Sequence, residues 1–130
     1  MRKTGFALSL CAFVLVGCST AAPVMSISQT VNTQQAGDSM RTQIAIYEAL
    51  QGRGWQLQSD DGSKIIARYN KQDRHTAVIQ IDYSAYRYSI KHVSSQGLNY
   101  NVKRNSIHRN FNRWIKNLEM DINSKLSFMP

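Results

Sequence analysis

The stretch HTAVIQIDY, residues 75–83, alternates apolar side chains with more polar ones at nearly every position. Alternation of this kind is typical of a β-strand with one packed face and one wet face, as in antiparallel sheets. The same period of two recurs on both sides of it, and polar segments rich in Asp, Asn and Ser separate the repeats. The pattern predicts an antiparallel meander with strands at about residues 55–58, 64–69, 75–83 and 86–92.

A helix is expected on each side of this meander. The first begins at Asp38 or Ser39, which are both good N-caps, and reaches about residue 51. Its predicted inward residues are Met40, Ile44, Tyr47 and Leu50, flanked by Ile46 and Ala49. The second begins between Asn101 and Ser106 and carries one continuous apolar stripe at helical spacing. The residues of that stripe are Ile107, Phe111, Trp114, Ile115, Leu118, Ile122 and Leu126.

These elements together predict an α+β fold of order α-β-β-β-β-α. Each helix has one apolar side, and the sheet has one apolar face to receive them. We therefore expect a two-layer sandwich in which an N-terminal and a long C-terminal helix pack on one face of a three- to four-stranded antiparallel sheet.

The N-terminus carries a targeting pattern. Two basic residues precede an apolar run over residues 6–16, which is shorter than the roughly 20 residues of a spanning helix but typical of a signal peptide. The run closes in LVGC, residues 15–18, which resembles a lipobox, where small residues precede a cysteine that receives diacylglycerol. We expect a lipoprotein signal peptide over residues 1–17 and a covalent lipid on Cys18. The alternative is an ordinary secretory signal with an incidental cysteine.

Removal of residues 1–17 changes the charge and the thiol content of the chain. The formal charge of +8 falls to +6 with the loss of two basic residues. Cys11 leaves with the signal and Cys18 carries the lipid, so no thiol remains for a disulfide, a cysteine metal site or a nucleophile. Ser19 is not the Asp that marks inner-membrane retention, which favours the outer membrane, facing the periplasm. Nucleic acid, the usual partner of a basic chain, is scarce there and is not an expected partner.

The remaining chain divides into a tether and one domain. Residues 18–37 are rich in Ser, Thr, Gln and Ala, with no charge, and are interpreted as the lipidated cysteine and a flexible tether. Residues 38–130 are expected to form a single α+β domain, because a chain of 130 residues allows one domain and makes two improbable. Apart from the lipid, no cofactor is expected.

Catalytic and metal-binding signatures are missing from the sequence. His75, His92 and His108 lie far apart, and none stands in a zinc-binding spacing, so no metal site is expected. There is no serine-nucleophile elbow, no Ser-x-x-Lys and no phosphate-binding glycine loop. A carboxylate pair could assemble only in three dimensions, which leaves an enzyme with an unrecognised site as the third hypothesis for the function.

Aromatic and basic residues mix on the predicted strands and on the last helix. On the strands they are Tyr69, Tyr83, Tyr86 and Tyr88, beside Arg68, Arg87 and Lys91. They form either a tyrosine-rich inner layer with arginines on the wet face, or a surface for an anionic, ring-containing partner. On the helix, Arg109, Arg113 and Lys116 lie opposite the apolar stripe. This possible basic surface is either solvated or docks on anionic lipid or an acidic partner.

Short segments spread along the chain carry a resemblance to a known family. They are Ala49-Leu50, Arg53, Trp55, Ile66-Ala67, residues 77–83, Tyr88-Ser89-Ile90, Ser94-Ser95, Leu98-Asn99-Tyr100, Ile107-His108, Asn112, Trp114 and Asn117-Leu118. With the lipobox, and over about residues 44–122, the chain resembles a family of small uncharacterised lipoproteins of Gram-negative bacteria. The resemblance implies the location and the fold, and it implies no activity.

The resemblance also points to one polar cluster, which includes Ser94, Asn99, Tyr100, His108 and Asn112. These residues either hold a loop to the start of the long helix or line a small polar pocket. The leading functional hypothesis is a non-enzymatic, lipid-anchored binding or scaffolding module, whose partner is an envelope protein or peptidoglycan. The alternative is recognition of an anionic glycan or lipid, such as lipopolysaccharide, by the aromatic and basic surface.

Overall fold

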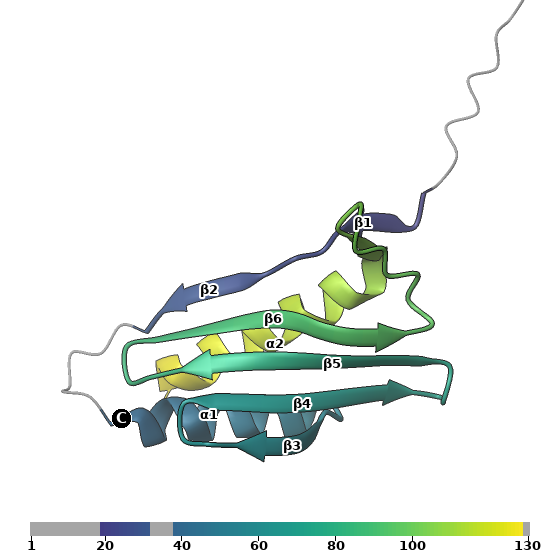
Figure 1. Cartoon of the computed structure of the whole chain (residues 1–130). Coiled ribbons are helices and arrows are strands. Elements are labelled where there is room, and N and C mark those ends of the chain that lie inside the picture. Colours follow the sequence, from purple (N-terminus) through teal and green to yellow (C-terminus); the bar gives the residue numbers. More distant parts are fainter. Residues whose placement is uncertain (1–18, 32–37, 129–130) are drawn as a thin grey trace, which may run out of the picture.

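A computed structural model describes residues 19–31 and 38–128 of the chain (Figure 1). The elements in chain order are β1 (Ala21–Pro23), β2 (Ile27–Thr30), α1 (Ser39–Gly52), β3 (Gln56–Asp60), β4 (Lys64–Lys71), β5 (His75–Tyr83), β6 (Arg87–Gln96), β7 (Ser106–His108) and α2 (Arg109–Phe128). The predicted signal peptide, Cys18 and the end of the predicted domain at residues 129–130 lie outside the described residues. The prediction of an α+β fold with two helices and an antiparallel sheet is confirmed.

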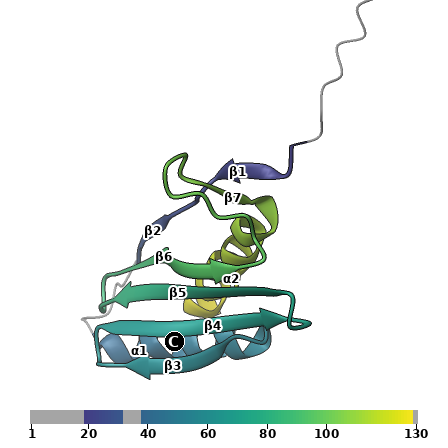
Figure 2. The ribbon, with the colours of Figure 1, turned by 45° about the vertical axis from the view of Figure 1, so that its right-hand side comes forward.

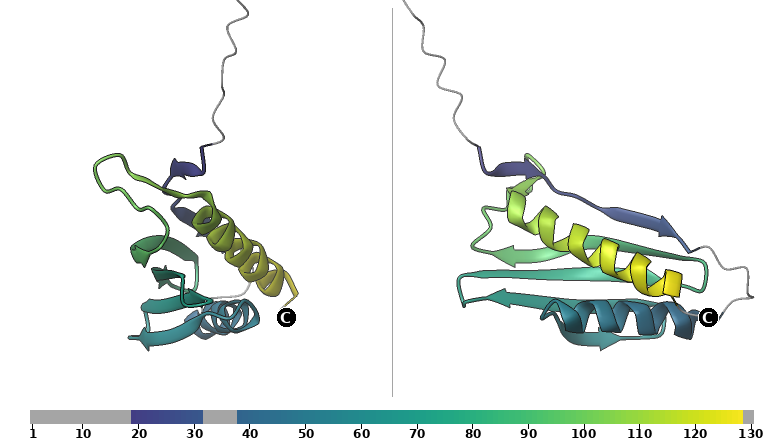
Figure 3. Two further views of the ribbon diagram at one scale, coloured as in Figure 1. Left: turned by 90° about the vertical axis from the view of Figure 1, so that its right-hand side faces the viewer. Right: turned by 180° about the vertical axis from the view of Figure 1, so that it is seen from behind.

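The main sheet has five strands in the order β2-β6-β5-β4-β3, and each neighbouring pair is antiparallel. Both helices lie side by side on one face of this sheet, as the two views in Figure 3 show. The register aligns four isoleucines in one row across four strands, and none is more than 5 % exposed. They are Ile27, Ile90, Ile81 and Ile65. This row forms the centre of the core beneath the helices.

The prediction of a flexible tether over residues 18–37 is wrong for residues 19–31. β1 pairs with β7 in a separate two-stranded sheet, and β2 pairs with β6 as an edge strand of the main sheet. Ile27 and Val31 are buried, at 5 % and 6 % exposed. Asn112 holds the connection between the two strands, because its Oδ1 accepts from the Met25 N–H at 3.0 Å and its Nδ2 donates to the Pro23 carbonyl at 2.8 Å. The sheet therefore has one strand more than expected.

The two helices differ from their predictions in detail. α1 begins at its expected cap, where the Asp38 side chain accepts from the Met40 N–H at 2.9 Å. Its buried side is rotated from the predicted one, since Met40 and Ile44 are 57 % and 42 % exposed. The buried residues are Thr42, Ala45, Ile46, Ala49 and Leu50. A helix with small residues on the inside, such as alanine, can approach the sheet and the second helix closely.

The predicted stripe is buried, apart from the half-buried Trp114, but α2 starts later than expected and Ile107 belongs to β7. Residues 106–108 form β7, and the helix begins at Arg109 because the backbone before it is paired with β1. His108 acts at this start, where its Nδ1 accepts from the Asn110 N–H at 3.1 Å. Among the described residues, neither helix is both long and apolar enough to cross a membrane.

Candidate functional site

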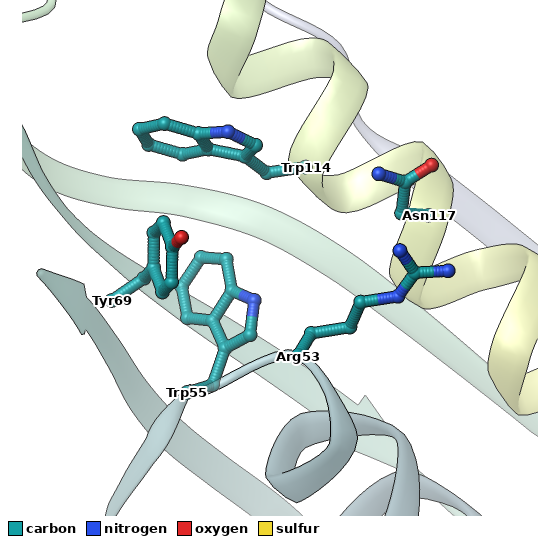
Figure 4. Close-up of a pocket in the computed structure, with 5 residues that line it drawn as sticks. All are labelled: Arg53, Trp55, Tyr69, Trp114 and Asn117. Carbon is teal, nitrogen blue, oxygen red and sulfur yellow. The ribbon is translucent and has the colours of Figure 1, made fainter. Parts of the chain in front are cut away.

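A small aromatic cleft lies where the end of α1, strand β4 and helix α2 meet (Figure 4). Its volume is about 130 Å³. The residues that line it are Arg53, Trp55, Tyr69, Trp114 and Asn117. They come from three separate parts of the chain, and Figure 4 shows the three aromatic rings gathered on one side with the Arg53 side chain reaching toward Asn117.

The end of α1 fixes two of these side chains. Arg53 is the C-cap of the helix, and its backbone N–H donates to the carbonyls of Ala49 and Leu50. Gly54 then turns the chain with φ of +79°, a conformation that glycine adopts without strain. The Trp55 N–H donates back to the Leu50 carbonyl at 2.9 Å, and its side chain is 6 % exposed. The Arg53 side chain before the turn and the Trp55 side chain after it are thus both directed to the cleft.

The rings form a chain of contacts. The centroids of Trp55 and Tyr69 are 5.2 Å apart with the planes tilted by 33°, and those of Tyr69 and Trp114 are 4.9 Å apart at 70°. Both distances lie in the range where aromatic pairs stabilise each other. Tyr69 and Trp114 are only partly buried, so part of their rings is accessible to a ligand. Asn117 lies three residues after Trp114 on α2, which places the two side chains next to each other on the helix surface.

Arg53 is held in place by one carboxylate. Its Nε and Nη2 donate to the two oxygens of Asp121 at 2.7 and 3.0 Å, a bidentate geometry that orients the planar guanidinium. The hydrogen bond from Arg53 lowers the pKa of Asp121 and outweighs the effect of burial, so both groups are ionised at neutral pH. The pair is partly exposed to solvent, which weakens its contribution to stability. Its main effect is to fix the direction of Arg53.

Several polar groups around the cleft have no hydrogen-bond partner among the described residues. They are Arg53 Nη1, the Asn117 amide, the Tyr69 hydroxyl and the indole nitrogens of Trp55 and Trp114. Buried polar groups are normally satisfied within the protein, and unsatisfied ones at an open cleft are available to solvent or to a ligand. Aromatic faces beside several donors can hold a ring that has an apolar face and a polar rim.

The five residues of the predicted polar cluster do not come together as one site. Ser94 is exposed and pairs with Val78 on the face of the sheet away from the helices. Asn99 adopts φ of +53° in the loop after β6. Tyr100 stacks on His92 with 4.3 Å between centroids, whereas His108 caps α2 and Asn112 holds residues 23–25. Each of the last three contacts a different segment.

A second histidine, His92, has a packing role, whereas His75 Nδ1 lies 2.8 Å from the Gly97 carbonyl oxygen. The His92 ring lies between Tyr100 and Phe111, and its Nε2 is 2.9 Å from the Ser95 hydroxyl. Burial lowers the pKa of His92, which favours the neutral ring at physiological pH. Within residues 19–31 and 38–128, no group of three or more His, Cys, Asp or Glu side chains is close enough to hold a metal ion.

The predicted aromatic and basic surface is divided between the two faces of the sheet. Tyr83 and Tyr88 are buried beneath the helices, and Tyr88 donates to Asn123 Oδ1 at 2.6 Å. Arg68, Arg87 and Lys91 lie on the opposite face, which no described element covers. This arrangement agrees with the inner-layer interpretation for Tyr83 and Tyr88, whereas Tyr86, between β5 and β6, is 59 % exposed. Tyr69 is partly buried and lines the aromatic cleft.

The predicted basic surface on α2 is exposed along its whole length. Arg109, Arg113 and Lys116 follow one another at i, i+4 and i+7 on the outer side of the helix. Lys116 differs from the other two, because its Nζ is 2.7 Å from the carboxylate of the buried Glu119. The hydrogen bond from Lys116 lowers the pKa of Glu119. Lys116 is therefore already paired with a negative charge.

A second polar cluster, the Asp60 cluster, lies between α1 and the sheet. The Asp60 carboxylate accepts hydrogen bonds from Gln43 at 2.7 Å, from the Gly62 N–H at 2.8 Å and from the hydroxyls of Tyr47 and Tyr83. Burial raises the pKa of Asp60, but these donors together lower it below its usual value. Burial and the neighbouring carboxylate raise the pKa of Tyr83 to about 12. With four donors satisfied inside the protein, this cluster is structural.

The Asp60 cluster predicts an acid-dependent loss of stability. A carboxylate with a lowered pKa in the fold contributes stability that is present above its unfolded pKa and is lost as the pH falls through the folded value, here below about pH 4. Asp60→Asn is expected to cost about 2 kcal/mol at neutral pH and to flatten the acid limb of the unfolding curve. Urea titrations at several pH values measure both. Asp73→Asn in the exposed β4–β5 turn is the matched control, and an equal change there would contradict the prediction.

A scan of protein-family models finds none that matches this chain, and a search of curated proteins finds no significant match either. The aromatic cleft was not predicted from the sequence. The sequence pattern places Trp55 and Tyr69 on separate strands and Trp114 in the apolar stripe of the last helix. A weak signal was present, because each of the three belongs to an apolar pattern yet carries a polar group that needs a hydrogen-bond partner when it is buried.

Proposed function

We propose that this chain is a small envelope lipoprotein, acylated on Cys18 and facing the periplasm from the outer membrane, whose folded domain binds a single saccharide ring in the aromatic cleft. It acts as a binding module and performs no chemistry on its ligand. The observation that carries the proposal is the cleft itself. Three aromatic rings line one hollow, and the five lining residues each carry a polar group without a partner among the described residues.

The size and the polar groups of the cleft limit the kinds of ligand that it can bind. A volume of about 130 Å³ is well below the roughly 300–1,000 Å³ of pockets that enclose a drug-sized molecule. One ring of a longer chain fits this volume better than a whole oligosaccharide. Arg53 keeps Nη1 as an unused charged donor beside its ion pair with Asp121, and a donor of this kind suits a carboxylate acceptor on the ring. An acidic sugar of the cell-wall glycan, such as an N-acetylmuramic acid unit, has these properties.

The lipid anchor is supported by the sequence. A basic start and a short apolar run precede the lipobox-like LVGC, which ends at Cys18. An anchor of this kind keeps the domain in the periplasm next to the glycan layer. Tethering raises the effective concentration of the ligand, so a weak single-ring site is sufficient for recognition.

Removal of the Arg53 charge is expected to weaken binding selectively. The probes are the disaccharide of N-acetylglucosamine and N-acetylmuramic acid, and chitobiose, which lacks the carboxylate. Arg53→Gln is expected to lower the affinity for the acidic probe at least about tenfold, because a charge-assisted hydrogen bond contributes about 1.5–3 kcal/mol. Its affinity for chitobiose is expected to change little. Tryptophan fluorescence and isothermal titration calorimetry measure both.

The matched control is Arg113→Gln, which removes the same charge from an exposed position of α2 outside the cleft. It is expected to bind both probes like the unaltered protein. Asn117→Ala removes a polar group from the cleft without a change of charge and is expected to weaken both probes alike. Equal affinities of the unaltered protein, Arg53→Gln and Asn117→Ala for both probes would show that the cleft does not bind sugars.

A further inference from the structure

The fold leaves little free chain between β1 and the position of the lipid. Ala21, the first residue of β1, is three residues after Cys18, and an extended chain spans at most about 3.6 Å per residue, or roughly 11 Å in all. β1 is fixed by its pairing with β7, and the Arg109 N–H donates to the Thr20 carbonyl at 2.8 Å. A lipid on Cys18 therefore holds this end of the domain close to the bilayer surface.

This end of the molecule is positively charged. Residues 97–113 contain Lys103, Arg104, Arg109 and Arg113, all exposed, and no Asp or Glu. Residues 19–31, which pack beside them, carry no charge. Elsewhere the basic residues of α2 have acidic partners, as Lys116 has Glu119 and Lys125 has Glu48. Four positive charges without an acid in the same segments point to an anionic partner.

Two of the charges lie on a protruding hairpin. Asn101 and Ser106 form an antiparallel bridge, and Asn101 Oδ1 accepts from the Arg104 N–H at 3.0 Å. Val102, at the tip beside Lys103, is 73 % exposed. This hairpin, β1 and the first turn of α2 lie at the same end of the molecule in Figures 1, 2 and 3. An apolar tip followed by two basic residues is suited to a surface with charged headgroups above an apolar layer.

We propose that this basic end, defined by Val102, Lys103, Arg104, Arg109 and Arg113, docks on the anionic phospholipid headgroups of the leaflet that holds the anchor. The inference rests on the lipidation of Cys18 in the proposed function. Beyond the proposed function, it specifies which surface of the domain faces the membrane. Lys116 lies outside this surface, because it is about 10 Å further along α2 than Arg109 and is paired with Glu119.

Electrostatics supports contact at this distance. An anionic leaflet attracts Lys and Arg side chains only within about a Debye length, near 8 Å at physiological ionic strength. A long flexible tether would let the domain leave that zone for most of the time. The short link from Cys18 to β1 keeps the basic end within or near it, so four modest attractions act together and orient the domain.

The test uses the full chain, produced with its lipid and reconstituted into vesicles. One vesicle type is phosphatidylcholine, and the other holds equal parts of phosphatidylcholine and phosphatidylglycerol. A fluorophore on Val102→Cys reports contact through quenching by a nitroxide-labelled lipid. The control position is Phe128→Cys, which is 86 % exposed at the other end of α2, about 28 Å along the helix from Arg109.

In phosphatidylglycerol vesicles, quenching at residue 102 is expected to exceed quenching at residue 128 at least threefold. The excess is expected to fall in high salt and in phosphatidylcholine alone, and to disappear when Lys103, Arg104, Arg109 and Arg113 are changed to Gln. Equal quenching at the two positions in protein whose mass shows lipid on Cys18 overturns the docking surface and leaves the anchor intact. Protein without lipid on Cys18, behaving like Cys18→Ser, overturns both proposals.

Discussion

A chain that begins at residue 32 is expected to be about 4 kcal/mol less stable than one that begins at residue 19. The shorter chain lacks β1 and β2, and with them Ile27 and Val31, which are 5 % and 6 % exposed. Burial of a Val or Ile side chain contributes about 1.5–3 kcal/mol each. The shorter chain also leaves the backbone groups of β6 unpaired along one edge. Urea unfolding followed by circular dichroism measures the difference.

A matched pair of variants separates burial from chain length. In the longer chain, Ile27→Ser with Val31→Ser is expected to lose most of the same stability, whereas Ser28→Ala and Thr30→Ala, at exposed positions of β2, are expected to change it little. If the chains beginning at residues 19 and 32 unfold at the same urea concentration, the segment is a tether after all. Equal urea unfolding midpoints of the two chains would also remove the support for a short link between Cys18 and the folded domain.

The assignment of this segment shows where composition misleads. Residues 19–31 are uncharged and rich in Ser, Thr and Gln, which is the composition of a linker. The alternation of Ile27, Gln29 and Val31 with Ser28 and Thr30 was nevertheless a strand signal of period two. An edge strand needs only one buried row, so two apolar residues were enough to bind it to β6.

Strong periodicity was the part of the fold that could be predicted. β5 and the inner row of α2 agree with their patterns, because a strict alternation or a long helical stripe has only one face that can be buried. α1 was less certain in its rotation, since Ala45 and Ala49 have too little side chain to outweigh Met40 and Ile44 in a pattern. The late start of α2 depended on β1, a partner 85 residues earlier in the chain.

The candidate cleft could not be predicted from spacing. Trp55, Tyr69 and Trp114 follow one another at separations of 14 and 45 residues, and their contact depends on how α1 and α2 pack on the sheet. Sequence periodicity tells which face of an element is buried, but it does not tell which residues of two elements lie at the same level. The basic stripe of α2 was visible in the sequence because it belongs to a single helix.

Gly97→Ala is expected to destabilise the protein by about 3 kcal/mol. Gly97 has φ of +73°, which costs about 1–2 kcal/mol for a residue with a Cβ. A Cβ there would also lie 2.0 Å from the Arg74 carbonyl oxygen, so the loop after β6 or the β4–β5 turn must move. Crowding of this kind costs roughly 1–3 kcal/mol. The change in unfolding free energy is measured by urea titration.

Two other glycines separate strain from crowding. Gly62 has φ of +93° with nothing within 4 Å of a Cβ, so Gly62→Ala is expected to cost only the strain, about 1 kcal/mol. Gly52 ends α1 without positive φ, and Gly52→Ala is expected to leave stability unchanged or raise it slightly. If Gly97→Ala costs no more than Gly62→Ala, the close approach to Arg74 is absent. The loop that ends in the basic hairpin would then not be fixed to the β4–β5 turn at this point, and the position of Val102 relative to the sheet would be freer than the structure shows.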